Sequence, residues 1–111
     1  MRSALCRVED LSNPGSAAFC IDVAGERRSI FLVRRGAEVF GYVNNCPHNG
    51  SPLDWQAGQF LDSKRQFVLC ATHGATFRIE DGLCLGGPCA GKSLVAVPLS
   101  QTEGMVWLDE I

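Results

Sequence analysis

The shortness of the apolar segments is the feature that most constrains the fold of this chain. No stretch of ten or more residues shows the apolar spacing of an amphipathic helix. Instead, the apolar segments are rich in β-branched and aromatic residues and end at glycine, proline or polar clusters. They cover residues 17–23, 29–33, 38–43, 66–70, 75–79, 94–97 and 105–108. Short strands separated by such turn signals predict an all-β protein, an antiparallel sandwich or barrel.

The length and composition are those of one globular domain. The chain has 111 residues, of which 46% are hydrophobic and 20% charged, and single domains usually have about 100–200 residues. We therefore expect residues 1–111 to form a single domain. No apolar run approaches the about 18 residues of a membrane helix, and no signal peptide is visible before Arg7. We expect a cytoplasmic protein with no membrane partner, and a net charge of −2 argues against a nucleic-acid partner.

Both histidines of the chain lie close to a cysteine. The pairs are Cys46-x-His48, in a loop-like segment, and Cys70-x-x-His73, with residues 49–69 between them. Thiolate and imidazole groups are ligands for zinc and iron. Two such loops could complete a tetrahedral zinc site or hold a two-iron cluster. A nucleophilic Cys–His pair is a third interpretation, which the duplication of the pair disfavours.

At these residues the chain resembles the Rieske family of [2Fe-2S] proteins, whose signature is C-x-H followed by C-x-x-H. The glycines that follow the two histidines, Gly50 and Gly74, also fit the family. Asp81-Gly82 fits its hairpin, and Gly86-Gly87-Pro88 stands where the family has a proline-containing loop over the cluster. The resemblance is dense from about residue 43 to residue 98 and looser in the N-terminal strands.

The resemblance implies a Rieske-type fold, in which strands from both ends of the chain form a base. A cluster-binding subdomain of about residues 44–91 is inserted into that base. One [2Fe-2S] cluster per chain is expected, with Cys46 and Cys70 on the buried iron and His48 and His73 on the outer iron. The two ligand loops and the proline-containing loop are expected to meet at one tip.

Departures from the family pattern indicate a branch within it. Ser51 and Thr72 replace two cysteines that form a disulfide in the high-potential Rieske proteins of cytochrome bc complexes. Ala75 and Phe77 replace a serine and a tyrosine that donate hydrogen bonds to the cluster sulfurs in those proteins. With fewer donors the reduced state is less stabilised. We predict a reduction potential of about −150 mV rather than about +300 mV.

Small proteins of this pattern are similar to the Rieske-type ferredoxins of ring-hydroxylating dioxygenase systems. The resemblance implies a one-electron carrier that docks transiently on a flavin reductase and on a terminal oxygenase or reductase. It is not expected to be an enzyme on its own, because no histidine remains for a mononuclear iron site. Two alternatives stay open: a permanently bound subunit of a nitrite reductase-like or oxygenase complex, and a structural Cys2His2 zinc module.

The other four cysteines have no ligand role in the family pattern. Cys6 and Cys20 lie in apolar strand contexts and are expected to be buried. Cys84 and Cys89 flank residues 85–88, where they could form a loop disulfide. Free thiols are favoured there, because a reducing compartment is expected.

Overall fold

The computed structural model describes residues 3–23, 25–45, 53–54, 58–70, 74–87 and 90–109. In these residues it has nine strands and one short 3-10 helix, so the prediction of an all-β protein is confirmed. The elements are β1 (Ser3–Arg7), η1 (Val8–Asp10), β2 (Gly15–Val23), β3 (Glu26–Arg35), β4 (Glu38–Val43), β5 (Val68–Leu69), β6 (Thr76–Phe77), β7 (Cys84–Gly86), β8 (Leu99–Thr102) and β9 (Met105–Leu108). In the described part of the chain there is no helix of the length and apolarity that a membrane crossing requires.

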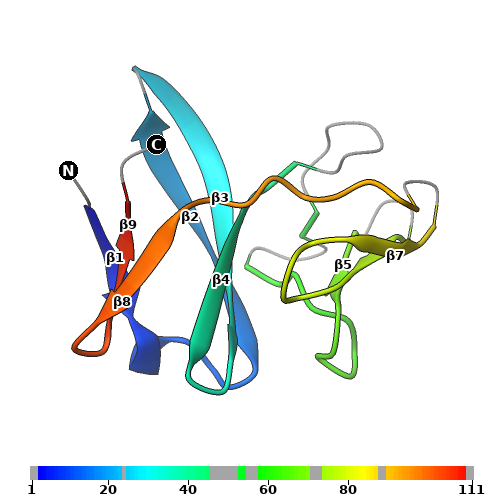
Figure 1. Cartoon of the computed structure of the whole chain (residues 1–111), viewed down its shortest axis with the longest axis horizontal. Helices are drawn as coiled ribbons and strands as arrows, with labels where there is room; N and C mark the ends of the chain where they lie inside the picture. The colour runs from blue at the N-terminus through cyan, green and yellow to red at the C-terminus, as the bar shows by residue number, and fades with distance from the viewer. Residues whose placement is uncertain are drawn as a thin grey trace.

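The strands form three antiparallel sheets of three strands each. The orders are β1-β9-β8, β2-β3-β4 and β5-β6-β7. Because β1 pairs with β9, the two ends of the chain lie in one sheet, with Ser3 opposite Leu108. Figure 1 shows the first two sheets together on one side and the third sheet, made from the segment between β4 and β8, on the other. This arrangement matches the expected base with a part inserted into it.

The two sheets of the base enclose a small apolar core. Leu32 of β3 and Val106 of β9 are both fully buried and belong to one cluster of side chains. Gly41 of β4 allows the sheets to approach, since a Cβ there would lie 2.8 Å from Cδ1 of Leu99 in β8. The base is therefore held by apolar packing between strands from opposite ends of the chain.

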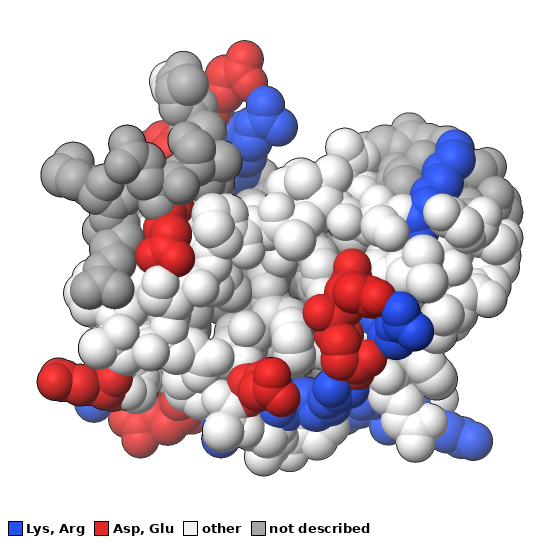
Figure 2. Space-filling model, viewed as in Figure 1, with Lys and Arg blue, Asp and Glu red and all other residues white. Residues whose placement is uncertain are grey.

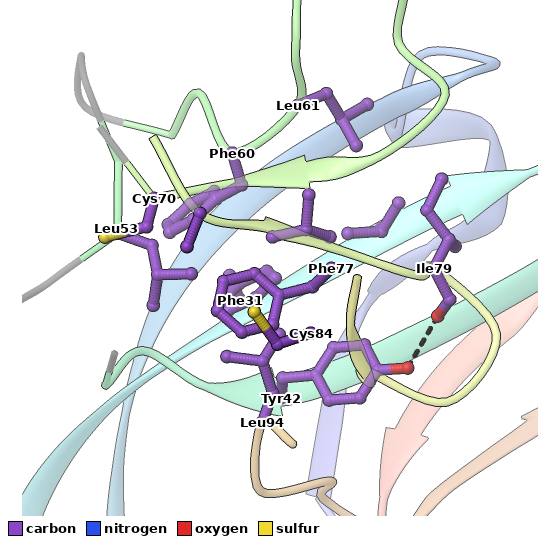
Figure 3. Packing of buried hydrophobic residues seen from close by; sticks show 13 residues of the cluster. Phe31, Tyr42, Leu53, Phe60, Leu61, Cys70, Phe77, Ile79, Cys84 and Leu94 are labelled. Atoms are coloured by element: carbon purple, nitrogen blue, oxygen red, sulfur yellow. Dashed lines mark hydrogen bonds between the residues drawn. The ribbon is translucent and has the colours of Figure 1, made fainter. Parts of the chain in front are cut away.

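A second apolar cluster joins the base to the inserted sheet, and we call it the junction core. Its members are Phe31, Val33, Tyr42, Leu53, Phe60, Leu61, Val68, Cys70, Ala75, Phe77, Ile79, Cys84 and Leu94. Phe31 of β3 stacks on Phe60 with ring centroids 4.2 Å apart, and Phe77 of β6 is fully buried (Figure 3). Burial stabilises the fold by roughly 1.5–3 kcal/mol for each such side chain. The junction core is thus the main connection between the two parts.

Two sequence-based expectations are wrong. Residues 94–97 do not form a strand; the segment makes one isolated bridge to the base, between Ala96 and Tyr42. A strand requires a ladder of such pairs, and this segment has only the bridge. Cys20, expected in the core, is exposed, because Phe19 and Ile21 on either side of it in β2 point to the core face.

The only tyrosine of the chain connects β4 to the turn after β6. Tyr42 is 2% exposed, and its hydroxyl donates a hydrogen bond of 2.5 Å to the carbonyl of Ile79 (Figure 3). Gly82 lies against the ring, where a Cβ would be 2.8 Å from Cε1 of Tyr42. Burial, with a smaller effect of Asp81, raises the pKa of Tyr42 to about 12.

This pKa predicts a specific loss of stability at alkaline pH. Because the folded pKa of Tyr42 is about 12 and the ordinary value is 10.0, the stabilisation is complete below pH 10. The free energy of unfolding then falls by roughly 2–3 kcal/mol as pH rises from about 10 to about 12. Tyr42→Phe should remove this dependence and cost about 1 kcal/mol at neutral pH, since the Ile79 carbonyl loses its donor.

Urea unfolding of the two proteins at a series of pH values measures the effect. The phenolate absorbance of wild type minus Tyr42→Phe reports the titration of this side chain directly. Parallel stability curves for the two proteins between pH 10 and pH 12 would show that Tyr42 does not titrate in this way.

Candidate metal centre

Of the four predicted ligands, the structure describes Cys70. Cys46, His48 and His73 lie outside the described residues. Among the residues that are described, no group of three or more histidine, cysteine, aspartate or glutamate side chains could hold a metal ion. The structure does show where each ligand loop begins and ends, and what packs beneath it.

Cys70 lies at the end of the junction core. It directly follows β5 and is fully buried. Figure 3 shows Cys70 and Leu53 at one end of this cluster, and Ile79 and Tyr42 at the other. A fully buried thiol at this end of the core suits a ligand of the buried iron in a mixed-ligand cluster.

Hydrogen bonds close the second ligand loop. The Cys70 N–H donates to the Ala75 carbonyl at 2.8 Å, and the Gly74 N–H donates to the Cys70 carbonyl at 2.9 Å. Gly74 has φ +70, a left-handed conformation that favours glycine. The predicted ligand His73 therefore lies, in sequence, directly before a fixed turn.

The first ligand loop is also tied at its ends. The Leu53 N–H donates to Oδ1 of Asn44 at 2.8 Å, and Leu53 is buried in the same cluster as Cys70. Next to Leu53, Asp54 accepts a hydrogen bond from the Gly58 N–H at 3.4 Å. Segments far apart in the sequence thus bring the ends of both ligand loops to one end of the junction core.

The glycine-rich segment after β7 lies on the second ligand loop. Gly87 has φ +100, and a Cβ on it would lie 2.8 Å from Cα and 3.0 Å from Cβ of Ala75. Only a glycine permits this approach of one backbone to another. The expected contact between this segment and the second ligand loop is therefore present at Gly87 and Ala75, whereas Pro88 lies outside the described residues.

The positions that carry hydroxyl donors in high-potential relatives are apolar and buried here. Ala75 and Phe77 are both fully buried in the junction core. Ser51 and Thr72 lie outside the described residues, as does Cys89. Cys84 is 3% exposed and belongs to the junction core. The state of the Cys84 and Cys89 pair stays a prediction.

Acidic side chains near the junction are paired with arginines. Arg35 of β3 forms an ion pair with Glu80, and the Arg78 guanidinium binds Asp81, with Nε 2.9 Å from Oδ1. Arg78 and the N–H of Leu83 lower the pKa of Asp81 to about 2. Figure 2 shows acidic and basic groups next to one another low on this face, below a broad uncharged area. The face as a whole does not present one sign of charge.

Sequence reasoning did not single out Asn44. Its side chain connects the end of β4 to Leu53. This role could have been suspected from the sequence, because an asparagine directly after a strand commonly binds nearby backbone through its side chain. Gly87, by contrast, belongs to the Gly86-Gly87-Pro88 segment on which the resemblance rested.

Comparison with known families decides the classification. The family model described as the Rieske [2Fe-2S] domain matches residues 2–102. The chain belongs to the Rieske family. No curated protein sequence matches this chain.

Solved structures share the fold of this Rieske chain. The ferredoxin of carbazole 1,9a-dioxygenase from Nocardioides aromaticivorans IC177 is 18% identical with a TM-score of 0.75, and the match covers 100% of this chain and 99% of that chain. A complex of reduced oxygenase and oxidized ferredoxin in carbazole 1,9a-dioxygenase matches at 18% identity and a TM-score of 0.72, over 96% of this chain and 91% of that chain. The terminal oxygenase of carbazole 1,9a-dioxygenase from Novosphingobium sp. KA1 matches at 18% identity and a TM-score of 0.75, over 96% of this chain and 29% of that chain.

Cys70 and the described ends of the second ligand loop fit the cluster that gives the family its name. Two cysteines and two histidines are the mixed donor set of a Rieske centre. Beside the second ligand loop, Cys70 and Ala75 are fully buried, hydrogen bonds close the turn between them, and Gly87 approaches Ala75 closely.

The contact of Gly87 with Ala75 can be tested by adding a single methyl group. Gly87→Ala combines an unfavourable positive φ with a clash against backbone, so the free energy of unfolding should fall by roughly 2–4 kcal/mol. Two neighbouring glycines serve as controls. Gly91→Ala has a φ of +89 but nothing within 4 Å, so it should cost about 1 kcal/mol.

Gly86→Ala meets only the Thr76 hydroxyl at 3.7 Å and should stay within about 0.5 kcal/mol of the wild type. Denaturant unfolding of the three variants measures these differences. Equal losses in Gly87→Ala and Gly91→Ala would mean that the Ala75 contact contributes nothing.

Proposed function

We propose that this chain is a Rieske-type ferredoxin, a one-electron carrier with one [2Fe-2S] cluster held by Cys46, His48, Cys70 and His73. The observation that carries the proposal is that all four ligand positions are filled in a chain that matches the Rieske domain over residues 2–102. The same proposal places the carrier in the cytoplasm and gives it no catalytic residues of its own.

When bound, the cluster takes up and releases one electron. The two thiolates and two neutral imidazoles of the chain balance the charge of the oxidised centre. A set of four thiolates would leave it doubly negative and harder to reduce. The junction core keeps water away from Cys70, which is fully buried.

The proposed partners are a flavin reductase and a terminal oxygenase or reductase. In support, chains of this fold include a ferredoxin of carbazole 1,9a-dioxygenase and a complex of reduced oxygenase with oxidized ferredoxin. A carrier must dock and leave within a turnover, so we expect a small interface, below about 1,200 Å². The mixture of paired charges and uncharged surface in Figure 2 is compatible with weak docking.

Metal and sulfide analysis of the purified protein tests the cluster. We expect a coloured protein with about two irons and about two acid-labile sulfides per chain. Substitution of any one of the four ligands by alanine should lose the iron. A colourless protein with a single zinc would instead identify the structural zinc module.

The carrier role is tested by isolating the protein from its native cells. A carrier should separate from its partners during size-exclusion chromatography, because the complexes are weak. Stable co-purification with a large flavin- or haem-containing chain would identify a permanently bound subunit instead.

The apolar residues at positions 75 and 77 predict the reduction potential. We expect a midpoint near the low end of the Rieske range, about −150 mV. Ala75→Ser should raise the midpoint, because a hydroxyl donor near the cluster stabilises the reduced state. Ala18→Ser, the same change at an exposed site on β2, is the control and should leave it unchanged. A wild-type midpoint above about +100 mV would contradict the argument from missing donors.

A further inference from the structure

We propose that Asn44 is a positioning residue for the first ligand loop, and that its side-chain amide fixes the segments on both sides of Cys46 and His48. The inference rests on the proposed function, because it assigns a task to Asn44 in a cluster-binding chain. Asn44 itself is not a ligand.

Asn44 is fixed to the base of the protein. It directly follows β4, is half-buried, and its backbone N–H donates to the Ser29 carbonyl of β3 at 3.0 Å. Its side chain also reaches β3, since Nδ2 lies 3.3 Å from the Ser29 hydroxyl oxygen. Asn44 therefore extends the rigid β3–β4 pairing by one residue toward the ligand loop.

The same side chain binds the segment that leaves the loop. Oδ1 accepts the Leu53 N–H at 2.8 Å, and Nδ2 donates to Oδ1 of Asp54 at 3.4 Å. This orientation of the amide is the one that its partners require: a backbone N–H can only donate, and a carboxylate can only accept. A single side-chain amide thus joins the residue before the first ligand loop to the two residues at its exit, Leu53 and Asp54.

The exit is itself immobilised. Leu53 is fully buried in the junction core beside Cys70, and Asp54 accepts the Gly58 N–H at 3.4 Å through its second oxygen. Through Leu53, Asn44 connects the first ligand loop to the part of the core that carries the ligand of the second loop.

The short distance along the chain makes this connection matter for the ligands. Cys46 is two residues from Asn44, and two residues span at most about 7 Å. A displaced Asn44 would therefore carry the Cys46 backbone with it. Metal centres need their ligands held to within about 0.5 Å of the required geometry, so loss of the Asn44 contacts should disturb the cluster and not only the stability of the fold.

A double-mutant cycle between Asn44 and Asp54 tests the proposal. In Asn44→Asp the new carboxylate still accepts the Leu53 N–H but faces the Asp54 carboxylate, so the exit is pushed away. In the double variant with Asp54→Asn, the new amide can donate to the carboxylate at position 44. The net charge then equals that of the wild type. The hydrogen bond between positions 44 and 54 is restored, with its donor and acceptor exchanged. Asp54→Asn alone keeps an acceptor for Asn44, but its amide nitrogen then replaces the oxygen that accepts the Gly58 N–H, so that one contact is lost.

The readouts are the electron paramagnetic resonance spectrum of the reduced protein and the rate at which a chelator removes iron. We expect Asn44→Asp to shift the g values and to lose iron about tenfold faster, the effect of losing one hydrogen bond. The double variant should return to within about twofold of the wild type. A charge effect alone would instead make Asp54→Asn lose iron more slowly than the wild type by about the factor that Asn44→Asp gains, so the single variant Asp54→Asn distinguishes the two explanations.

Asn13→Asp is the matched control. Oδ1 of Asn13 also accepts a backbone N–H, from Gly36 in the turn between β3 and β4 at 2.8 Å, and this contact belongs to the base. The control should leave the spectrum and the iron loss unchanged, even if it changes the free energy of unfolding.

The outcomes separate the two proposals. If the wild type holds the cluster and Asn44→Asp has the wild-type spectrum and rate of iron loss, the role of Asn44 is wrong and the proposed function stands. A double variant as defective as Asn44→Asp also overturns the role of Asn44. A wild type without an iron–sulfur cluster contradicts the proposed function, and the positioning role with it.

Discussion

Apolar packing in the junction core is the interaction on which the rest of the structure depends. The core joins Phe31 of the base to Phe60 and to Phe77 of the inserted sheet, and all three are fully buried. The third sheet has two strands of only two residues each, β5 and β6. So small a sheet is marginal alone. Its stability must come from packing on the base, and the same packing places Cys70 and Leu53 at one end of the core.

Short hydrogen bonds convert that packing into a defined site. Both ligand loops are closed at their ends, the first through Asn44 and Leu53 and the second through Cys70 and Ala75. The ends of each loop are therefore held at a fixed distance from one another. For the proposed electron carrier, fixed loop ends limit the rearrangement of the chain that a change of one electron requires.

Local pattern predicted some parts of this molecule and not others. The β2-β3-β4 meander and β9 were predictable, because their apolar residues and turn glycines are contiguous in sequence. β8 was not, since Leu99–Thr102 is largely polar and becomes a strand through its pairing with β9. The predicted ligand pairs were recognisable because each histidine lies within three residues of a cysteine. The role of Asn44 depends on contacts with Leu53 and Asp54 that exist only after folding.

The central claim is that two histidines and two cysteines of this chain hold a two-iron cluster. Because the chain has only two histidines, selective labelling of histidine with nitrogen-15 marks these two rings and no others. Pulsed electron paramagnetic resonance of the reduced protein should then show coupling of the cluster to nitrogen from both rings, with the hyperfine pattern changed by the label. A cluster signal without any label-dependent nitrogen coupling would contradict the account.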